Sequence, residues 1–274
     1  MRRLSYLNTL IKKELWLFIS NKKNLALVSI IPAFVLFFTV VVPMLTGPRT
    51  YTPETYALAL KYIKESSYEF GLTQNDVDKL GENAITFVTI FQLPPVLGIF
   101  AALAVFQTIT ASFMAEKSSG TMEILLASPV EIEEVVISKA TVGVLMGIIT
   151  WIMLFLGMTL SLEYLSIKYI GRIWIPCMNY IWSMVILPIS LLLFGLALSL
   201  FAGIRGSEFL AGLFIFTIMA APIGIIMTVA IFQLPAQLFF LLLELLGGLS
   251  FLLSILIIAM SYKMIDRLSF IRNY

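Results

Sequence analysis

Ionisable side chains carry most chemistry inside membranes, and one of them, Glu244, stands within a long apolar run of this 274-residue sequence. A carboxylate in hydrocarbon is costly, so Glu244 could bind a cation or relay a proton. A relay normally needs partners, and no other charge lies near Glu244 in the sequence, which favours a hydrated position close to the outer surface. The chain has no histidine and one cysteine, Cys177, so a Cys/His metal site and an intrachain disulfide are both excluded.

Polar residues and prolines near helix ends are weaker candidates, for a transport pathway or a gate. The pentapeptide Ile-Phe-Gln-Leu-Pro occurs at 90–94 and again at 231–235, and both copies are expected near the external face. The two copies could frame an outer gate, although chance or the punctuation of helix ends is the favoured explanation. A polar flank at 107–112 could likewise face a pathway or make hydrogen bonds between helices. The pathway candidates are Gln92, Pro94, Gln107, Gln233, Pro235 and Glu244.

The most informative stretch is a charged connector between two long apolar runs. Its pattern predicts the end of one helix, a break at Gly120, a short helix capped by Thr121 and a stop at Pro129. A second helix then opens with carboxylates in its first turn. Neighbouring antiparallel helices can be joined by a few residues, so the length of this connector favours a docking surface over a plain turn. The candidate docking residues are Glu116, Lys117, Gly120, Thr121, Glu123, Leu125, Leu126, Ser128, Pro129, Glu131, Glu133 and Glu134.

At this connector the chain resembles the permease subunits of ABC-2 type ATP-binding cassette transporters. In that family the loop between the second and third spans reads Glu, a basic residue, Gly-Thr, Glu, a Leu pair and Ser-Pro. The candidate docking residues from Glu116 through Pro129 match this pattern. The resemblance implies that the connector and an N-terminal helix dock onto a separate ATPase subunit, and that two permease chains, identical or homologous, line one pathway.

Composition indicates which solvent surrounds the chain. Hydrophobic residues make up 60% and charged residues 12% of the sequence, whereas soluble domains are near half apolar and about a quarter charged. Long apolar runs follow one another with charges in the gaps, which predicts a multi-pass, all-α integral membrane protein surrounded by lipids. The net charge of +2 is too small, and the basic residues are too localised, for a nucleic-acid partner.

Six transmembrane helices are predicted from the apolar runs, within a single permease domain that covers residues 1–274. Gly143 and Gly147 form a Gly-x-x-x-Gly step in the third span, which allows close packing against another helix of the same subunit. Residues 116–139, between the second and third spans, form a cytoplasmic coupling loop. The predicted spans are 25–45, 93–115, 140–162, 178–202, 209–232 and 238–260.

Residues 46–83 are predicted to form an external helical segment between the first two spans. Pro53 is expected to begin a helix and Gly71 to end one, and Thr73 can form a capping box with Asp76. Two short helices are therefore expected there, outside the bilayer.

The N-terminal segment 1–23 allows two interpretations. Apolar residues recur at helical spacing with basic residues on the opposite side, which is typical of an amphipathic helix in the membrane interface. Alternatively, the segment is a basic flank that only sets orientation. With the proposed spans, twelve Lys and Arg residues lie on the cytoplasmic side and six on the external side, so both termini are expected in the cytoplasm.

The function implied by the resemblance is export across the cell (plasma) membrane, driven by ATP hydrolysis in a partner. No Gly-x-x-x-x-Gly-Lys-Ser/Thr phosphate loop occurs in the sequence, so the chain is not expected to be an enzyme or to hold a cofactor, and ATP and Mg belong to the partner. An ATP-independent channel or a secondary transporter would show inverted repeats and buried charged sites. An intramembrane enzyme would need at least two cooperating polar groups, and Glu244 alone argues against it.

Overall fold

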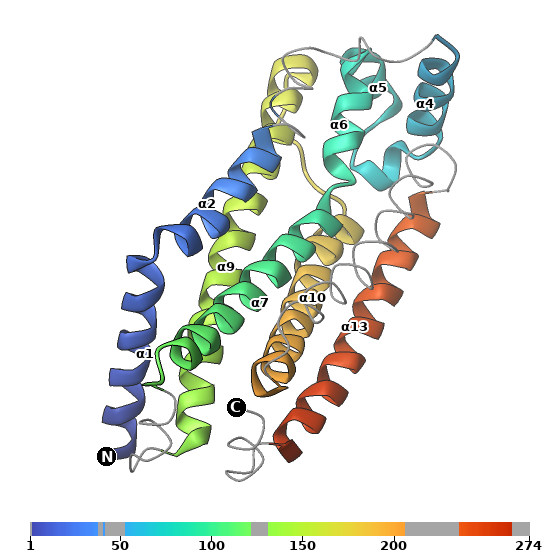
Figure 1. Cartoon of the computed structure of the whole chain (residues 1–274). Coiled ribbons are helices and arrows are strands. Elements are labelled where there is room, and N and C mark those ends of the chain that lie inside the picture. The colour runs from blue at the N-terminus through green and yellow to red at the C-terminus, as the bar shows by residue number, and fades with distance from the viewer. Residues whose placement is uncertain (1, 38–40, 42–52, 122–130, 206–235, 265–274) are drawn as a thin grey trace.

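The computed structural model describes residues 2–37, 41, 53–121, 131–205 and 236–264, and every regular element within these ranges is a helix (Figure 1). The four longest helices follow the longest apolar runs of the sequence. The elements are α1 (Arg2–Ser20), α2 (Lys22–Leu36), α4 (Pro53–Glu65), η2 (Ser67–Phe70), α5 (Gln74–Leu80), α6 (Asn83–Phe91), α7 (Pro94–Ser118), α9 (Ile132–Leu165), η3 (Ser166–Ile170), α10 (Met178–Arg205) and α13 (Ala236–Met264).

Four stretches are long and apolar enough to cross a membrane, which confirms the all-α membrane class. They are Pro94–Ser118, Ile132–Ile170, Tyr180–Gly203 and Gln237–Tyr262, and they correspond to four of the six predicted spans. Helix α2 covers only the first part of the predicted span 25–45, and the predicted span 209–232 lies outside the described residues.

The long helices pack side by side in the order α2, α9, α7, α10 and α13, with α1 against the lower part of α9 and α7. Glycines allow the closest approaches. A Cβ on Gly143 would lie 2.4 Å from Ile109 of α7, and a Cβ on Gly147 would lie 2.4 Å from Val105. The expected close packing at the Gly-x-x-x-Gly step is therefore confirmed, and it joins α9 to α7 within one chain.

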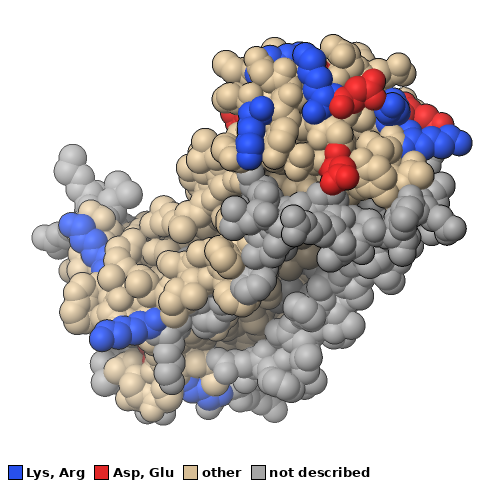
Figure 2. Space-filling view, turned by 90° about the horizontal axis from the view of Figure 1, so that it is seen from above, with Lys and Arg blue, Asp and Glu red and all other residues tan. Residues whose placement is uncertain are grey.

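The helices α4, η2, α5 and α6 form a cap over one end of the bundle (Figure 1). Helix α4 begins at Pro53, Gly71 adopts φ 67° after η2, and Thr73 exchanges capping-box hydrogen bonds with Asp76. These local predictions are confirmed. Seen from above the cap, Lys and Arg side chains alternate with Asp and Glu, as Figure 2 shows, and Lys64 forms an ion pair with Asp78 at 2.7 Å.

The opposite end of the bundle carries the connector between α7 and α9. Helix α1 begins and helix α13 ends at this connector end (Figure 1). Helix α7 continues to Ser118 and α9 already begins at Ile132, so only residues 119–131 of the predicted loop 116–139 lie between the two helices. Helix α9 then runs without a break for 34 residues, so the base of this helix is continuous with the predicted third span.

Candidate functional site

The connector leaves α7 through a glycine turn. Ser119 is the C-cap of α7, and Gly120 follows with φ 67°, in the left-handed region that favours glycine. No atom of the described residues lies within 4 Å of a Cβ built on Gly120, so the left-handed backbone conformation explains the glycine. The Thr121 hydroxyl donates to the carbonyl oxygen of Glu116 at 3.3 Å and ties the turn back to the helix. The predicted helix break is therefore confirmed.

The connector enters α9 through acidic residues. Glu131 is the N-cap residue of α9, in an extended conformation, and Glu133 and Glu134 lie in its first turn. Carboxylates at this position are stabilised by the positive end of the helix dipole, as the sequence predicts. The docking candidates Glu123, Leu125, Leu126, Ser128 and Pro129 lie outside the described residues.

A group of charges, buried except for Lys13, joins the two ends of the connector to α1. We call Lys13, Glu14, Ser112, Glu116 and Lys139 the charged cluster; it draws on α1, α7 and α9. The Nζ atom of Lys139 lies 3.0 Å from Glu14 Oε1, 2.8 Å from Glu116 Oε2 and 2.6 Å from Ser112 Oγ. Lys13 donates to Glu116 Oε1 at 2.8 Å, and Ser112 donates to Glu14 Oε2 at 2.5 Å.

Burial makes these contacts energetically important. Lys139 is 1% exposed, and Glu14 and Glu116 are each 4% exposed. An isolated charge at such a position costs several kcal/mol, so each needs its partner. The two lysines and the two glutamates balance in charge, and the Phe113 ring, 5.2 Å from Lys139 Nζ, adds a cation–π contact. The charged cluster therefore fixes α1 against the ends of α7 and α9 that flank the connector.

Glu116 is the only member of the charged cluster among the predicted docking residues, and Ser112 belongs to the predicted polar flank of 107–112. The sequence contains a signal for the others. Glu14 continues the inward face of α1 at helical spacing from Leu7, Ile11 and Phe18, and Phe18 is buried with it. Lys139 likewise shares the buried face of α9 that includes Val135 and Val142. A charge on an apolar helical face predicts a buried partner from another helix.

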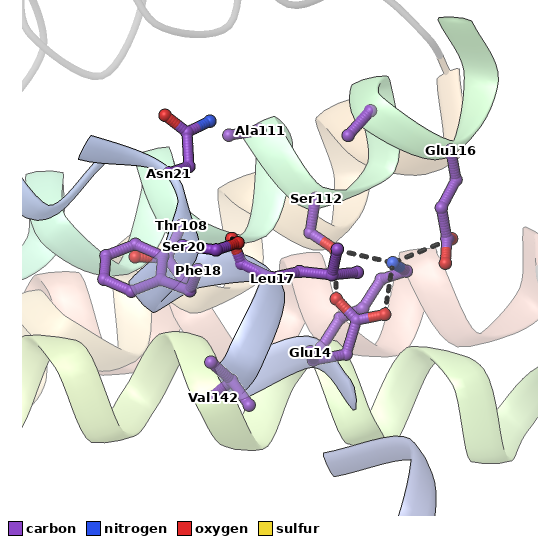
Figure 3. A pocket seen from close by; sticks show the side chains of 12 residues that line it. Glu14, Leu17, Phe18, Ser20, Asn21, Thr108, Ala111, Ser112, Glu116 and Val142 are labelled. Carbon is purple, nitrogen blue, oxygen red and sulfur yellow. Dashed lines mark hydrogen bonds and ion pairs between the residues drawn. The ribbon is translucent and has the colours of Figure 1, made fainter. Parts of the chain in front are cut away.

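A cavity of about 300 Å³ lies beside the charged cluster, between α1, α7 and α9 (Figure 3). In Figure 3 the side chains of Glu14, Ser112 and Glu116 point toward one another, and dashed lines join the interacting atoms. Leu17 and Asn21, which also line the cavity, are exposed near the junction of α1 and α2. The cavity thus has a buried polar end and an exposed mouth.

The predicted pathway residues that the structure describes do not come together in one site. Glu244 lies on an exposed face of α13. Pro94 opens α7, and Gln107 is half-buried on α7. Gln233 and Pro235 lie outside the described residues. Across the part of the chain that the structure describes, no group of His, Cys, Asp and Glu side chains could hold a metal ion.

Gln92 is one of three residues toward the cap end that have buried, uncharged polar atoms. We call Tyr62, Gln92 and Tyr180 the neutral cluster. Both amide atoms of Gln92 and the two phenol oxygens are buried and lack hydrogen-bond partners in the described structure. Burial raises the pKa of Tyr62 to about 12.

Aromatic rings surround the neutral cluster and hold the cap on the bundle. The Phe91 ring stacks on Tyr180 with centroids 4.3 Å apart and meets Phe70 edge-on at 4.9 Å. The Trp174 indole donates to the carbonyl oxygen of Phe70 at 2.9 Å. Aromatic contacts of this kind stabilise a packed core beyond the area that they bury.

Comparison with known proteins gave no match among family models, curated proteins or solved structures.

Proposed function

We propose that the chain is the transmembrane permease subunit of an ABC-2 type ATP-binding cassette exporter in the cell membrane. Two such chains form the translocation pathway, and a separate subunit binds ATP and Mg and supplies the energy. The observation that carries the proposal is the anchoring of the connector. Glu116 and Lys139, which flank it, form an ion pair with each other, and Lys139 also pairs with Glu14 on α1.

The connector supplies the surface on which the ATPase subunit acts. Its sequence from Glu116 to Pro129 carries the family pattern, and acidic side chains at the start of α9 extend the charged surface. The charged cluster holds the helix ends on both sides of the connector, so a force applied to the connector is transmitted to α1, α7 and α9 together. A partner that moves the connector therefore moves three helices instead of one.

Helix α9 is suited to transmit that movement along the bundle. Its 34 residues correspond to about 50 Å at 1.5 Å per residue, which exceeds the roughly 30 Å thickness of the hydrocarbon layer. Gly143 and Gly147 hold α9 tightly against α7. Tilting the base of α9 would therefore displace the α7 backbone as well and open a pathway at the far end.

The proposal is tested by purifying the tagged chain from its host in mild detergent and identifying the proteins that co-purify in stoichiometric amount. The test variant is Gly120→Val, which strains the connector backbone without filling occupied space. Gly171→Val is the matched control, because Gly171 also has a left-handed conformation (φ 82°) and open space around it, but at the cap end.

We expect a soluble ATPase subunit with a phosphate loop to co-purify with the wild-type chain and with the Gly171 variant. The Gly120 variant should retain less than a tenth of the partner and of the ATP hydrolysis while remaining inserted in the membrane. A chain that purifies alone and transports without ATP would refute the proposal and favour a channel or a secondary transporter.

A further inference from the structure

The exposed side of α9 changes its chemical character near the cap end. Leu156, Leu160 and Tyr164 follow one another at one-turn spacing, and each is more than half exposed. The next turn continues this stripe with exposed Ile167 and Lys168, and the Nζ atom of Lys168 lies 5.3 Å from the centre of the Tyr164 ring. An apolar stripe that ends in a tyrosine and a lysine is typical of the boundary between hydrocarbon and lipid headgroups. The membrane surface on the cap side therefore lies near Tyr164 and Lys168.

The chain returns toward the membrane after this boundary. We call residues 171–177 the α9–α10 loop. Figure 1 shows that this loop descends from the yellow upper end of α9 and η3 to the start of α10, which lies lower in the view. At the start of α10, Met178, Ile181 and Trp182 are exposed, as expected for the lipid-facing side of a span. The α9–α10 loop therefore connects two lipid-facing surfaces at the depth of the membrane boundary.

Side chains of the α9–α10 loop alternate between the cap and the surroundings. Arg172 forms an ion pair with Asp76, and Trp174 is buried against the cap. Ile173 and Ile175 have the opposite direction and are 68% and 71% exposed. This alternation is the pattern of an extended chain with one side packed. Contacts on the packed side thus hold the backbone from which the two isoleucines project.

The two isoleucines differ from the rest of the exposed cap surface. On that surface Lys61 pairs with Glu65, and Lys64 pairs with Asp78, as expected for side chains in water. A pair of isoleucines exposed side by side instead marks a surface that contacts an apolar partner. Because the pair continues the lipid-facing sides of α9 and α10, phospholipid is the partner that it fits.

We propose that the α9–α10 loop is inserted into the membrane surface on the cap side, with Ile173 and Ile175 against the upper part of the phospholipid acyl chains. Lys168 then lies at the level of the lipid phosphates. Since Arg172 and Trp174 bind the cap, the loop fixes the cap relative to the bilayer as well as to the bundle. This contact needs neither an ATPase partner nor a second chain, so it stands or falls separately from the proposed function.

Fluorescence quenching in phosphatidylcholine nanodiscs tests the proposal, with a bimane probe on one introduced cysteine in each variant. The background is Cys177→Ser, because a serine hydroxyl can keep the hydrogen bond that Cys177 donates to the carbonyl oxygen of Glu69. The probes are placed by Ile173→Cys and by Ile175→Cys. Both positions are exposed, so the substitutions leave the packed side of the loop intact.

Two control positions have a similar exposed fraction in known surroundings. Lys61→Cys lies among the charged side chains of the cap, where the Lys61 side chain is 73% exposed. Leu252→Cys lies near the middle of the apolar stretch of α13, where Leu252 is 66% exposed. Because exposure is matched, differences in quenching report the solvent around each probe.

Iodide quenches probes in water, and a nitroxide on the lipid acyl chain quenches probes in the membrane. We expect iodide to quench the probes at 173 and 175 at least threefold less than the probe at 61, and the lipid nitroxide to quench them at least threefold more. Quenching like that at position 61 would place the loop in water and overturn the proposal. Protection from both quenchers would also overturn it, because protein, such as a second copy of the chain, would then cover the loop.

The depth of the nitroxide distinguishes a surface contact from a deeper one. A nitroxide near the headgroup end of the acyl chain should quench the probes at 173 and 175 at least twofold more than a nitroxide near the chain terminus. The probe at 252 should show the reverse order. A preference of the loop probes for the deep nitroxide would contradict insertion at the membrane surface.

Discussion

The two polar clusters, at opposite ends of the bundle, differ in whether their buried polar atoms have partners. The charged cluster brings two lysines and two glutamates into ion pairs. The neutral cluster contains an amide and two phenols whose polar atoms have no hydrogen-bond partners among the described residues. A buried charge without a partner is far more costly than a buried amide, so only neutral groups can remain unpaired.

The difference indicates what each end of the molecule is built for. At the connector end, removing any charged partner leaves an uncompensated charge, so α1, α7 and α9 are held in one arrangement. At the cap end, aromatic packing provides the stability, and the neutral cluster reduces it. The connector end is therefore suited to receive a load, whereas the cap end holds polar groups that would gain partners if the cap opened to water.

Removal of the central lysine should have the largest effect. Lys139→Met leaves Glu14 and Glu116 buried with only the partly exposed Lys13 beside them, and we expect a loss of about 3–5 kcal/mol in the free energy of unfolding. Denaturant titration of the purified chain in detergent measures it. Lys168→Met, at an exposed site near the cap, is the control and should unfold like the wild type.

A double variant sharpens this result. Adding Glu116→Gln to Lys139→Met removes one of the stranded charges and should recover part of the lost stability. If Lys139→Met alone were as stable as the Lys168 control, the charged cluster would not hold these helices together.

A variant of the capping box tests whether a paired charge at the cap end stabilises the fold as much as the charged cluster does. Asp76→Asn removes a carboxylate that accepts from Thr73 and pairs with Arg172, and we expect a loss of about 1–2 kcal/mol at pH 7. Asp78→Asn is the control, because its ion pair with Lys64 is exposed and should contribute at most about 1 kcal/mol. Equal losses from both variants would show that burial of Asp76 is unimportant.

The same carboxylate should make the cap sensitive to acid. Burial alone would raise the pKa of Asp76, but hydrogen bonds from Thr73 and the Arg172 ion pair together hold that pKa below its usual value. Its contribution is therefore complete above the ordinary pKa of about 3.9 and is lost as the pH falls below it. The unfolding temperature should drop less on acidification in Asp76→Asn than in the wild type.

Removing the buried Gln92 amide, which has no hydrogen-bond partner among the described residues, should have the opposite effect on stability. Gln92→Leu keeps a similar volume and eliminates two buried polar atoms, so we expect a gain of about 1 kcal/mol in the free energy of unfolding. Gln107→Leu, at a half-buried position of α7, serves as the control for the change in side-chain type. A loss of stability on changing Gln92 would mean that ordered water or another group satisfies it.

The smallest effect is expected at Glu244. Its side chain is exposed on α13, so Glu244→Gln should change the free energy of unfolding by less than about 0.5 kcal/mol. If the proposed function holds, ATP hydrolysis by the partner subunit should also be retained. If Glu244→Gln lost ATP hydrolysis while its free energy of unfolding stayed unchanged, Glu244 would have a functional role.

Much of the fold follows from signals that act over a few residues. The long apolar runs predict the membrane class and four spans that the structure describes. The helix start at Pro53, the capping box of Thr73 and Asp76, and the break at Gly120 are also predicted correctly. Each depends on local backbone conformation or on hydropathy over one helix, which neighbouring residues encode directly.

The candidate site could be predicted only in part, because its members are distant along the chain. Glu116 is found through the connector motif, but its cations are not. The side-chain hydrogen bond from Lys139 to Glu14 joins residues 125 positions apart, and the one from Lys13 to Glu116 joins residues 103 positions apart. A lone charge on an apolar helical face shows only that some partner is needed.

The sequence by itself determined where the helices run, where they break and that lipid surrounds them. Only the tertiary structure decided which charges meet, that the Gln92 amide has no hydrogen-bond partner among the described residues, that Glu244 is exposed, and that a cavity lies beside Lys139. The physical reason is the range of the interactions. Hydropathy and capping act within a helix, whereas the pairing of buried charges depends on how separate helices are rotated and packed against one another.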